Sequence, residues 1–111
     1  MDSIDSFAEW TNSTVKYDPT VENEYLSYGL VAEVGELAGD MAKYYRGDYD
    51  YVELRKRVKK ELGDAFWFLA RMCVYNGWKP SEVLDVNMDK LEGRLRDNTI
   101  KGDDDNRGNM L

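Results

Sequence analysis

The sequence predicts an all-α protein, folded as an antiparallel helical bundle of about four helices. Apolar residues recur at steps of three and four along extended stretches, which is typical of helices that bury one face. Short connections that contain glycine or proline separate these stretches. Short connections favour antiparallel packing of neighbouring helices. No segment alternates between apolar and polar residues as a strand does. With 111 residues, we expect residues 1–111 to form a single helical domain.

The first two helices are predicted over residues 3–17 and 21–46. The first has a weak apolar pattern and ends before Pro19, because proline disfavours helix in the residue that precedes it. The second is followed by Gly47, a plausible helix stop. Its steps of four and three predict a buried stripe made of Leu26, Leu30, Val34, Leu37, Met41 and Tyr44.

The third and fourth helices have clearer start signals. Asp50 and Glu53 resemble a capping box that opens the third helix, and Gly77 closes it. Pro80 suits the first turn of the fourth helix. Their predicted buried stripes are Val58, Leu62, Ala65, Leu69 and Met72, followed by Leu84, Met88, Leu91 and Leu95. Residues 97–111 are polar and show no periodicity, so we expect a flexible tail or a lid.

Composition excludes several classes of function. The net charge of −7 argues against nucleic-acid binding, which requires basic side chains to neutralise phosphates. The chain has no histidine, which rules out histidine-based triads and metal sites, and Cys73 alone cannot form a disulfide framework. The apolar runs are too short to span a membrane, and no signal peptide is visible. We therefore expect a cytoplasmic protein with no membrane partner.

Two pairs of carboxylates are the main candidates for a functional site. Glu33 and Glu36 lie on the second predicted helix, and Glu61 and Asp64 lie on the third. A three-residue step places both acids of a pair on one helix face, and like charges there cost roughly 0.2–0.5 kcal/mol on an open helix. Neither Glu33 nor Glu36 has a basic residue one turn away. The pattern indicates a hard cation bound by oxygens, the alternative being a solvated acidic face.

The acids and a set of basic residues occupy matching positions. Each of the four acids comes one residue before a predicted core residue, and so do Asn87, Lys90 and Arg94 on the fourth helix. These positions flank the buried stripe, so the two sets could line a shared cleft for a metal ion and phosphate oxygens. Lys43 and Lys60 lie near the acid pairs and are further candidates. The alternative for the basic residues is pairing with acids on the surface.

Other features have two interpretations each. Gly29, Gly35, Gly39 and Gly63 lie inside predicted helices and indicate either close helix packing or room for a ligand. Aromatic residues near the acids indicate either core or a stacking surface for a base: Trp67, Phe68 and Tyr44. The apolar faces of the two long helices exceed what one chain is expected to cover, which predicts a homo-oligomer.

With these motifs, the chain resembles the MazG-like nucleotide pyrophosphohydrolases. The resemblance rests on Glu33-x-x-Glu36 within GLVAEVGELAGDMAK and on Glu61-x-x-Asp64 within ELGDAFWFLA. The later stretch NMDKLEGRLRDNTIKGDDDNR is also similar to that family, so the resemblance covers about residues 25–107. Asp97-Asn98 departs from the family pattern, where a basic residue and a glycine are expected.

The resemblance implies hydrolysis of nucleoside triphosphates between the α- and β-phosphates, giving a monophosphate and pyrophosphate. It implies that the positions matching Glu33, Glu36, Glu61 and Asp64 bind Mg²⁺, for which Mn²⁺ could substitute. It also implies an all-α homodimer or homotetramer, with sites between subunits or helices. The preferred base and sugar, and the number of metal ions, stay open.

Roles for individual residues follow from the chemistry of phosphoryl transfer. A carboxylate that the metal does not fully engage can accept the proton of the attacking water, for which we select Glu36 or Glu61. Lys90 and Arg94 would bind the phosphates, with Asn87 as a neutral donor. One alternative is a helical interaction or regulatory module that keeps the scaffold without catalysis. Another is a hydrolase that removes only the terminal phosphate.

Overall fold

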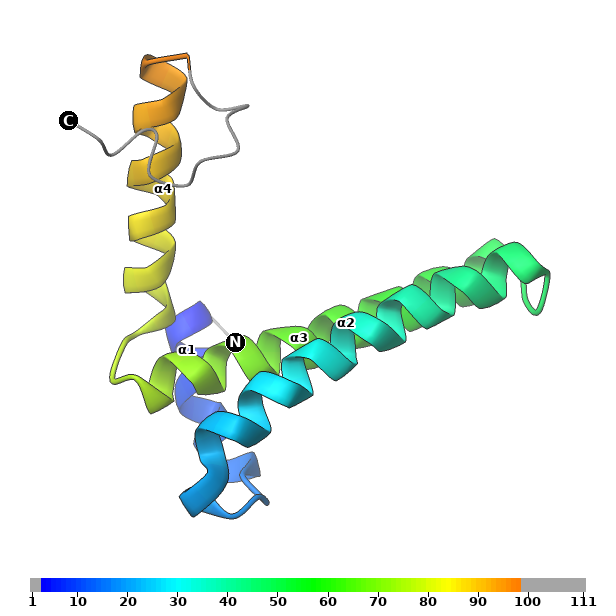
Figure 1. The fold of residues 1–111 in the computed structure, drawn as a ribbon, viewed down its shortest axis with the longest axis horizontal. Coiled ribbons are helices and arrows are strands. Elements are labelled where there is room, and N and C mark those ends of the chain that lie inside the picture. The colour runs from blue at the N-terminus through cyan, green and yellow to red at the C-terminus, as the bar shows by residue number, and fades with distance from the viewer. Residues whose placement is uncertain (1–2, 99–111) are drawn as a thin grey trace.

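A computed structural model describes residues 3–98 and shows only helices over this range (Figure 1). The four α-helices are α1 (Ile4–Thr11), α2 (Glu22–Arg46), α3 (Tyr51–Tyr75) and α4 (Pro80–Arg96). Two short 3-10 helices, Asn12–Thr14 and Pro19–Val21, connect α1 to α2. The all-α prediction is therefore confirmed for the described residues. The predicted tail or lid lies outside them, apart from Asp97 and Asn98 at the end of α4.

The N-terminal helix is shorter than the predicted range of 3–17. Ser3 caps its start by accepting a hydrogen bond from the Ser6 amide. At its end, hydroxyl groups donate to carbonyl oxygens three residues back, from Thr11 to Ala8 and from Thr14 to Thr11. Such local side-chain bonds compete with the regular helix pattern, so the chain tightens into a 3-10 turn.

Helices α2 and α3 form a long antiparallel pair, and their bounds match the predicted stops and caps (Figure 1). Gly47 ends α2 with a φ of 91°, a left-handed conformation that glycine adopts without a Cβ penalty. Asp50 then caps α3, because its carboxylate accepts a hydrogen bond of 2.9 Å from the Glu53 amide. The short turn keeps the two helices side by side along their length.

Helix α4 points away from the α2–α3 pair rather than packing along it (Figure 1). Near its start, the Asp5 carboxylate accepts hydrogen bonds from the Ser81 amide and hydroxyl, at 2.9 and 2.5 Å. The radius of gyration is 17.2 Å. About 13 Å is expected for a compact domain of this size. One chain therefore does not close the predicted bundle of four helices, although all four are present.

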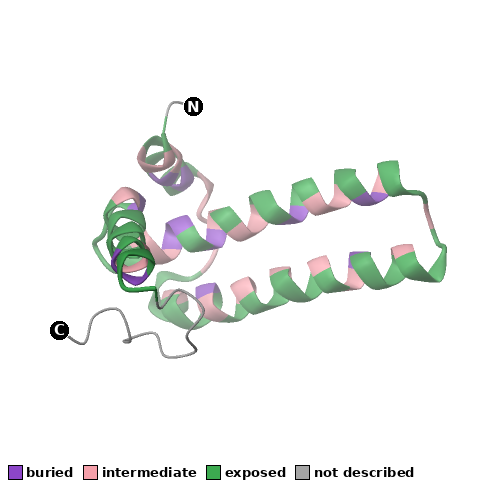
Figure 2. Cartoon of the chain, turned by 90° about the horizontal axis from the view of Figure 1, so that it is seen from above, coloured by how far each residue is buried: buried purple, intermediate pink, exposed green. Residues whose placement is uncertain are grey.

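The contact between α2 and α3 follows the predicted stripes only in part: Leu26 is buried, and Leu30, Leu37 and Tyr44 are half-buried. Leu26 and Leu54 are buried, but so are Asp40 and Glu61. Buried residues are sparse along both long helices (Figure 2). Several residues of the predicted stripes are instead exposed: Val34 (57%), Met41 (38%), Leu62 (46%) and Leu69 (45%). The prediction that the acids merely flank a buried apolar line is wrong, because acids occupy part of the helix contact itself.

The displaced apolar residues share one side of the helix pair, which we call the apolar face. It comprises Val34 and Met41 of α2 with Leu62, Phe66 and Leu69 of α3, all at steps of three, four or seven within each helix. A contiguous exposed apolar surface of this kind is unusual for a monomer. The face agrees with the prediction of a homo-oligomer, which stays a prediction.

The four glycines inside the helices have different surroundings. A Cβ at Gly29 would lie 2.2 Å from Cε1 of Phe68, so only glycine allows α2 to approach α3 at this point. No atom lies within 4 Å of the corresponding position at Gly35, Gly39 or Gly63. Close packing is thus confirmed at Gly29, and the other three face open space within the described chain.

Candidate active site

Three of the four predicted acids converge between α2 and α3. Glu33 of α2 and Glu61 and Asp64 of α3 each offer a carboxylate oxygen, and these oxygens lie within 4.8 Å of one another. The helix pairing brings them together, because Glu33 occupies the side of α2 that faces α3. We call Glu33, Glu61 and Asp64 the acidic cluster.

The buried oxygens of the acidic cluster lack the partners that buried carboxylates normally have. Glu61 is only 9% exposed, and Glu33 is half-buried. The Oε2 atoms of both residues are buried and find no hydrogen-bond donor among the described residues. Burying an unpaired carboxylate is costly unless a cation compensates it, and oxygen ligands suit a hard divalent ion. The residues present therefore fit a magnesium-type ion.

Mutual repulsion and burial make the charged state of this cluster unfavourable. Burial raises the pKa of Glu33 above its ordinary value, with Glu36 and Asp64 adding to the effect. The neighbouring Glu61 carboxyl raises the pKa of Glu36, and Glu33 raises that of Glu61. A bound cation would relieve this repulsion by supplying the opposite charge.

Glu36 lies at the edge of the acidic cluster rather than inside it. It is exposed, and its oxygens do not belong to the group that converges within 4.8 Å. Its pKa nevertheless responds to Glu61 first and also to Asp64, so its carboxyl lies beside them. A carboxylate next to a metal site and open to solvent is well placed to meet a water molecule.

Asp40 is a buried acid that sequence reasoning did not assign to the site. It is 8% exposed, and its Oδ1 lies 3.9 Å from Nη1 of Arg57 on α3. The Tyr49 hydroxyl donates a 2.6 Å hydrogen bond to the backbone oxygen of Asp40, and Arg57 lies over the Tyr49 ring. This contact pairs residues of different helices, so spacing along one helix could not reveal it.

The opposite end of the helix pair is closed by Arg71, which is 6% exposed. Its guanidinium donates hydrogen bonds to Thr11 Oγ1 at 3.2 Å and to Asn12 Oδ1 at 2.6 Å. It also lies 3.6 Å from a carboxylate oxygen of Glu22 and 3.4 Å from the Tyr17 hydroxyl. These contacts hold the N-terminal segment and the start of α2 against α3.

The two predicted lysines near the acids lie in different surroundings. Lys60 is close enough to Glu36 to lower the pKa of that carboxyl in part, against the larger effects that raise it. Lys43 instead contributes to lowering the pKa of Asp48 in the turn after α2, where Arg46 is the main cause. Lys60 is thus brought to the acids, and Lys43 is directed toward the turn.

The predicted phosphate-binding residues of α4 do not meet the acids of their own chain. Asn87, Lys90 and Arg94 lie on the helix that points away from the α2–α3 pair (Figure 1). Among the main causes of the pKa shifts of Glu33, Glu36 and Glu61, the basic residue is Lys60, which lies on α3 and not on α4. A cleft between these α4 residues and the acids is therefore not formed within one chain.

The aromatic residues near the acids mostly serve the core. The Trp67 indole donates a 2.7 Å hydrogen bond to Thr14 Oγ1, and Phe68 is buried against Gly29. Tyr44 packs against the rings of Tyr45 and Tyr51 at the far end of the helices. Trp67 and Phe68 have the contacts expected of core residues.

Comparisons with known proteins agree with this geometry. The model of the MazG nucleotide pyrophosphohydrolase domain matches residues 21–98, which include α2, α3 and α4. A relative, the gene 37 protein of Mycobacterium phage L5, is 37% identical over 86 residues, which are 75% of each chain. No solved structure gives a significant match. Among the described helices, none has both the length and the apolar character needed to cross a membrane.

Proposed function

The chain belongs to the family of MazG nucleotide pyrophosphohydrolase domains, and we propose that it hydrolyses nucleoside triphosphates in a Mg²⁺-dependent reaction. Cleavage between the α- and β-phosphates would release a nucleoside monophosphate and pyrophosphate. The substrates proposed are ribo- or deoxyribonucleotides in the cytoplasm.

One observation carries this proposal more than any other. Glu33, Glu61 and Asp64 present oxygens within 4.8 Å of one another, and Glu33 and Glu61 each keep a buried oxygen without a donor from residues 3–98. A folded chain tolerates such an arrangement when a ligand supplies the missing charge. Triphosphates reach proteins with divalent cations attached, which matches an acidic site in a chain of net charge −7.

The proposed metal ligands are Glu33, Glu36, Glu61 and Asp64, with Mn²⁺ as a substitute for Mg²⁺. The chemistry that a bound ion supplies is neutralisation of charge on phosphate oxygens and orientation of the reacting groups. Glu36 is solvent-exposed beside Glu61, so its carboxylate can accept a proton from the attacking water. Glu61 is the second candidate for this role, although its burial suits a metal ligand better.

Basic groups would hold the phosphates on the solvent side of the acids. Lys60 lies beside Glu36 and is available from the same chain. A second copy would have to supply Asn87, Lys90 and Arg94, because α4 points away from the acidic cluster of its own chain (Figure 1). We therefore propose a homodimer or homotetramer whose sites combine acids of one subunit with α4 of another.

Product analysis tests the proposed reaction directly. A panel of ribo- and deoxyribonucleoside triphosphates is incubated with and without Mg²⁺, and the products are separated. The proposal expects metal-dependent release of monophosphate and pyrophosphate. Inorganic phosphate as the product would move the attack to the terminal phosphate. No turnover of any nucleotide by a folded oligomer would overturn the proposal and favour a non-catalytic helical module.

A further inference from the structure

A groove lies on the apolar side of the α2–α3 pair and is lined by apolar and basic residues. It has a volume of about 770 Å³ and lies beside the turn between the two helices. Its floor is apolar, with Met41 of α2 and Leu54, Val58 and Leu62 of α3. Leu62 and Met41 are 46% and 38% exposed, so the described chain leaves this floor partly uncovered.

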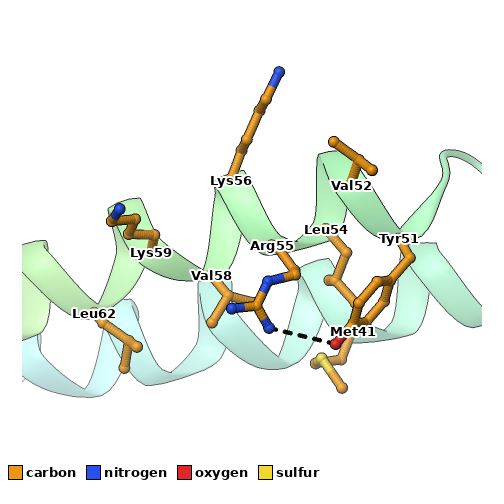
Figure 3. A pocket seen from close by; sticks show the side chains of 9 residues that line it. All are labelled: Met41, Tyr51, Val52, Leu54, Arg55, Lys56, Val58, Lys59 and Leu62. Atoms are coloured by element: carbon orange, nitrogen blue, oxygen red, sulfur yellow. Dashed lines mark hydrogen bonds between the residues drawn. The ribbon is translucent and has the colours of Figure 1, made fainter.

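Basic residues line the groove along α3. Arg55 and Lys59 are both exposed, and their four-residue spacing places them one helical turn apart on the same side. Figure 3 shows Arg55 turned toward Tyr51, to whose hydroxyl it donates a 3.4 Å hydrogen bond, and Lys56 extending away from the helices. Neither Arg55 nor Lys59 forms an ion pair with the described residues. A ligand for this groove should therefore be apolar in the middle and acidic on one side.

Helix α4 has this pattern. Leu84, Met88 and Leu95 form an apolar stripe that is 51–66% exposed. Asp85 and Asp89 lie on one side of the stripe, four residues apart, as Arg55 and Lys59 do on α3. Both acids are exposed, and neither forms an ion pair with the residues that the structure describes. The same spacing allows two acid–base pairs to form between two helices.

The occupant cannot be α4 of the same chain. That helix begins at the other end of α3 and points away from the α2–α3 pair, whereas the groove lies near the turn after α2 (Figure 1). A second copy has an identical α4 that is not restricted in this way. In a two-fold dimer, each copy would place its α4 in the groove of the other.

We propose that α4 of a second copy of this chain docks in the groove, with Asp85 and Asp89 facing Arg55 and Lys59. The apolar stripe of α4 covers Met41, Val58 and Leu62, and the charge pairs fix the orientation. This inference rests on the proposed self-association and specifies which surfaces make it.

Charge reversal on each side of the contact tests this docking. Two double variants are prepared, Arg55→Glu with Lys59→Glu, and Asp85→Lys with Asp89→Lys. In each variant alone, every groove faces a helix of the same charge, so self-association should weaken at least about tenfold. The two variants mixed in equal amounts are complementary at both contacts of a dimer, and the mixture should associate again. The measurement is sedimentation velocity on each sample.

Matched controls separate this contact from a general effect of charge. Lys16→Glu and Glu9→Lys reverse exposed charges away from the groove and should leave association unchanged. A mixture that stays dissociated would overturn the docking. So would double variants that associate like the wild type, although that result would leave the proposed oligomer standing. A monomeric wild type would overturn both, whereas metal-dependent hydrolysis by the wild type tests the enzymatic proposal separately.

Discussion

Two polar clusters buried on the same helix pair differ in how completely their charges are paired. Arg71, near the C-terminal end of α3, contacts Thr11, Asn12 and Glu22 within 3.6 Å. In the acidic cluster, Glu33 and Glu61 each keep a buried oxygen without a donor in the part of the chain that the structure describes, and their carboxyls repel one another. Burying charge is favourable only when partners compensate it. The charges of the Arg71 cluster are therefore compensated within the fold, whereas the unpaired acidic cluster fits the metal site that we propose.

We expect Glu61→Gln to cause the largest loss of activity. This change removes a proposed ligand and should lower kcat/KM for triphosphate hydrolysis by about 10²- to 10⁴-fold. It also removes one of the repelling charges, so the metal-free protein should be at least as stable as the wild type. Steady-state kinetics and chemical denaturation measure the two effects. Glu24→Gln, an exposed acid in the first turn of α2, is the control and should change neither.

Arg71→Met should have the opposite consequences. It leaves the buried Thr11 hydroxyl and the Glu22 carboxylate without their cation, which should cost about 3 kcal/mol of unfolding free energy. Lys16→Met changes an exposed basic residue outside the proposed contacts and should stay within about 0.5 kcal/mol of the wild type. Equal stability of the two variants, measured by urea denaturation, would contradict a structural role for the Arg71 cluster.

Glycine substitutions test the difference between the closely packed part of the helix pair at Gly29 and the open part at Gly35. Gly29→Ala places a methyl group 2.2 Å from the Phe68 ring, and overpacking of this kind costs about 1–3 kcal/mol. Gly35→Ala meets no atom within 4 Å and should stabilise α2 by up to about 1 kcal/mol. Thermal melts measure both effects. A higher Tm for Gly29→Ala than for Gly35→Ala would contradict the described packing.

The smallest effect concerns the pH dependence of the metal-free protein. Glu33, Glu36 and Glu61 all have pKa values raised above the ordinary 4.5 in the folded state. The folded protein thus binds these protons more tightly, so the unfolding free energy should fall as the pH rises above about 4.5. Saturating Mg²⁺ should reduce this fall by pairing the charged carboxylates. Denaturation curves between pH 4 and 7.5, with Mg²⁺ and with chelator, measure it.

Local signals in the sequence were enough to predict most helix boundaries. Gly47 and Asp50 end α2 and begin α3 through backbone conformation and a single side-chain hydrogen bond, and both act within a few residues. The range predicted for the first helix was too long, because the hydroxyls of Thr11 and Thr14 bond back to carbonyls and tighten the chain. A periodicity argument does not include such competition.

The line of contact between α2 and α3 could not be predicted from hydrophobicity. Two lines fit α2 equally in spacing, one through Val34 and Met41 and the other through Glu33 and Asp40. Hydrophobic periodicity selects the first, since charges usually avoid a core. The structure uses the second: Glu33 is half-buried and Asp40 is buried, whereas Val34 and Met41 are 57% and 38% exposed. Spacing along each helix singled out the four acids. The contacts of Arg57 with Asp40 and of Arg71 with Thr11 join different elements, so spacing along one helix does not predict them.

Whether the acidic cluster is a metal centre is tested most directly by isothermal titration calorimetry of Mg²⁺ binding to the metal-free protein, with Glu61→Gln and Arg71→Met in parallel. We expect Mg²⁺ to bind the wild type saturably and to bind Glu61→Gln at least about tenfold more weakly. The Mg²⁺ affinity of the folded fraction of Arg71→Met should change little. Equal Mg²⁺ affinity in the wild type and Glu61→Gln would contradict the assignment of the acidic cluster as a metal centre.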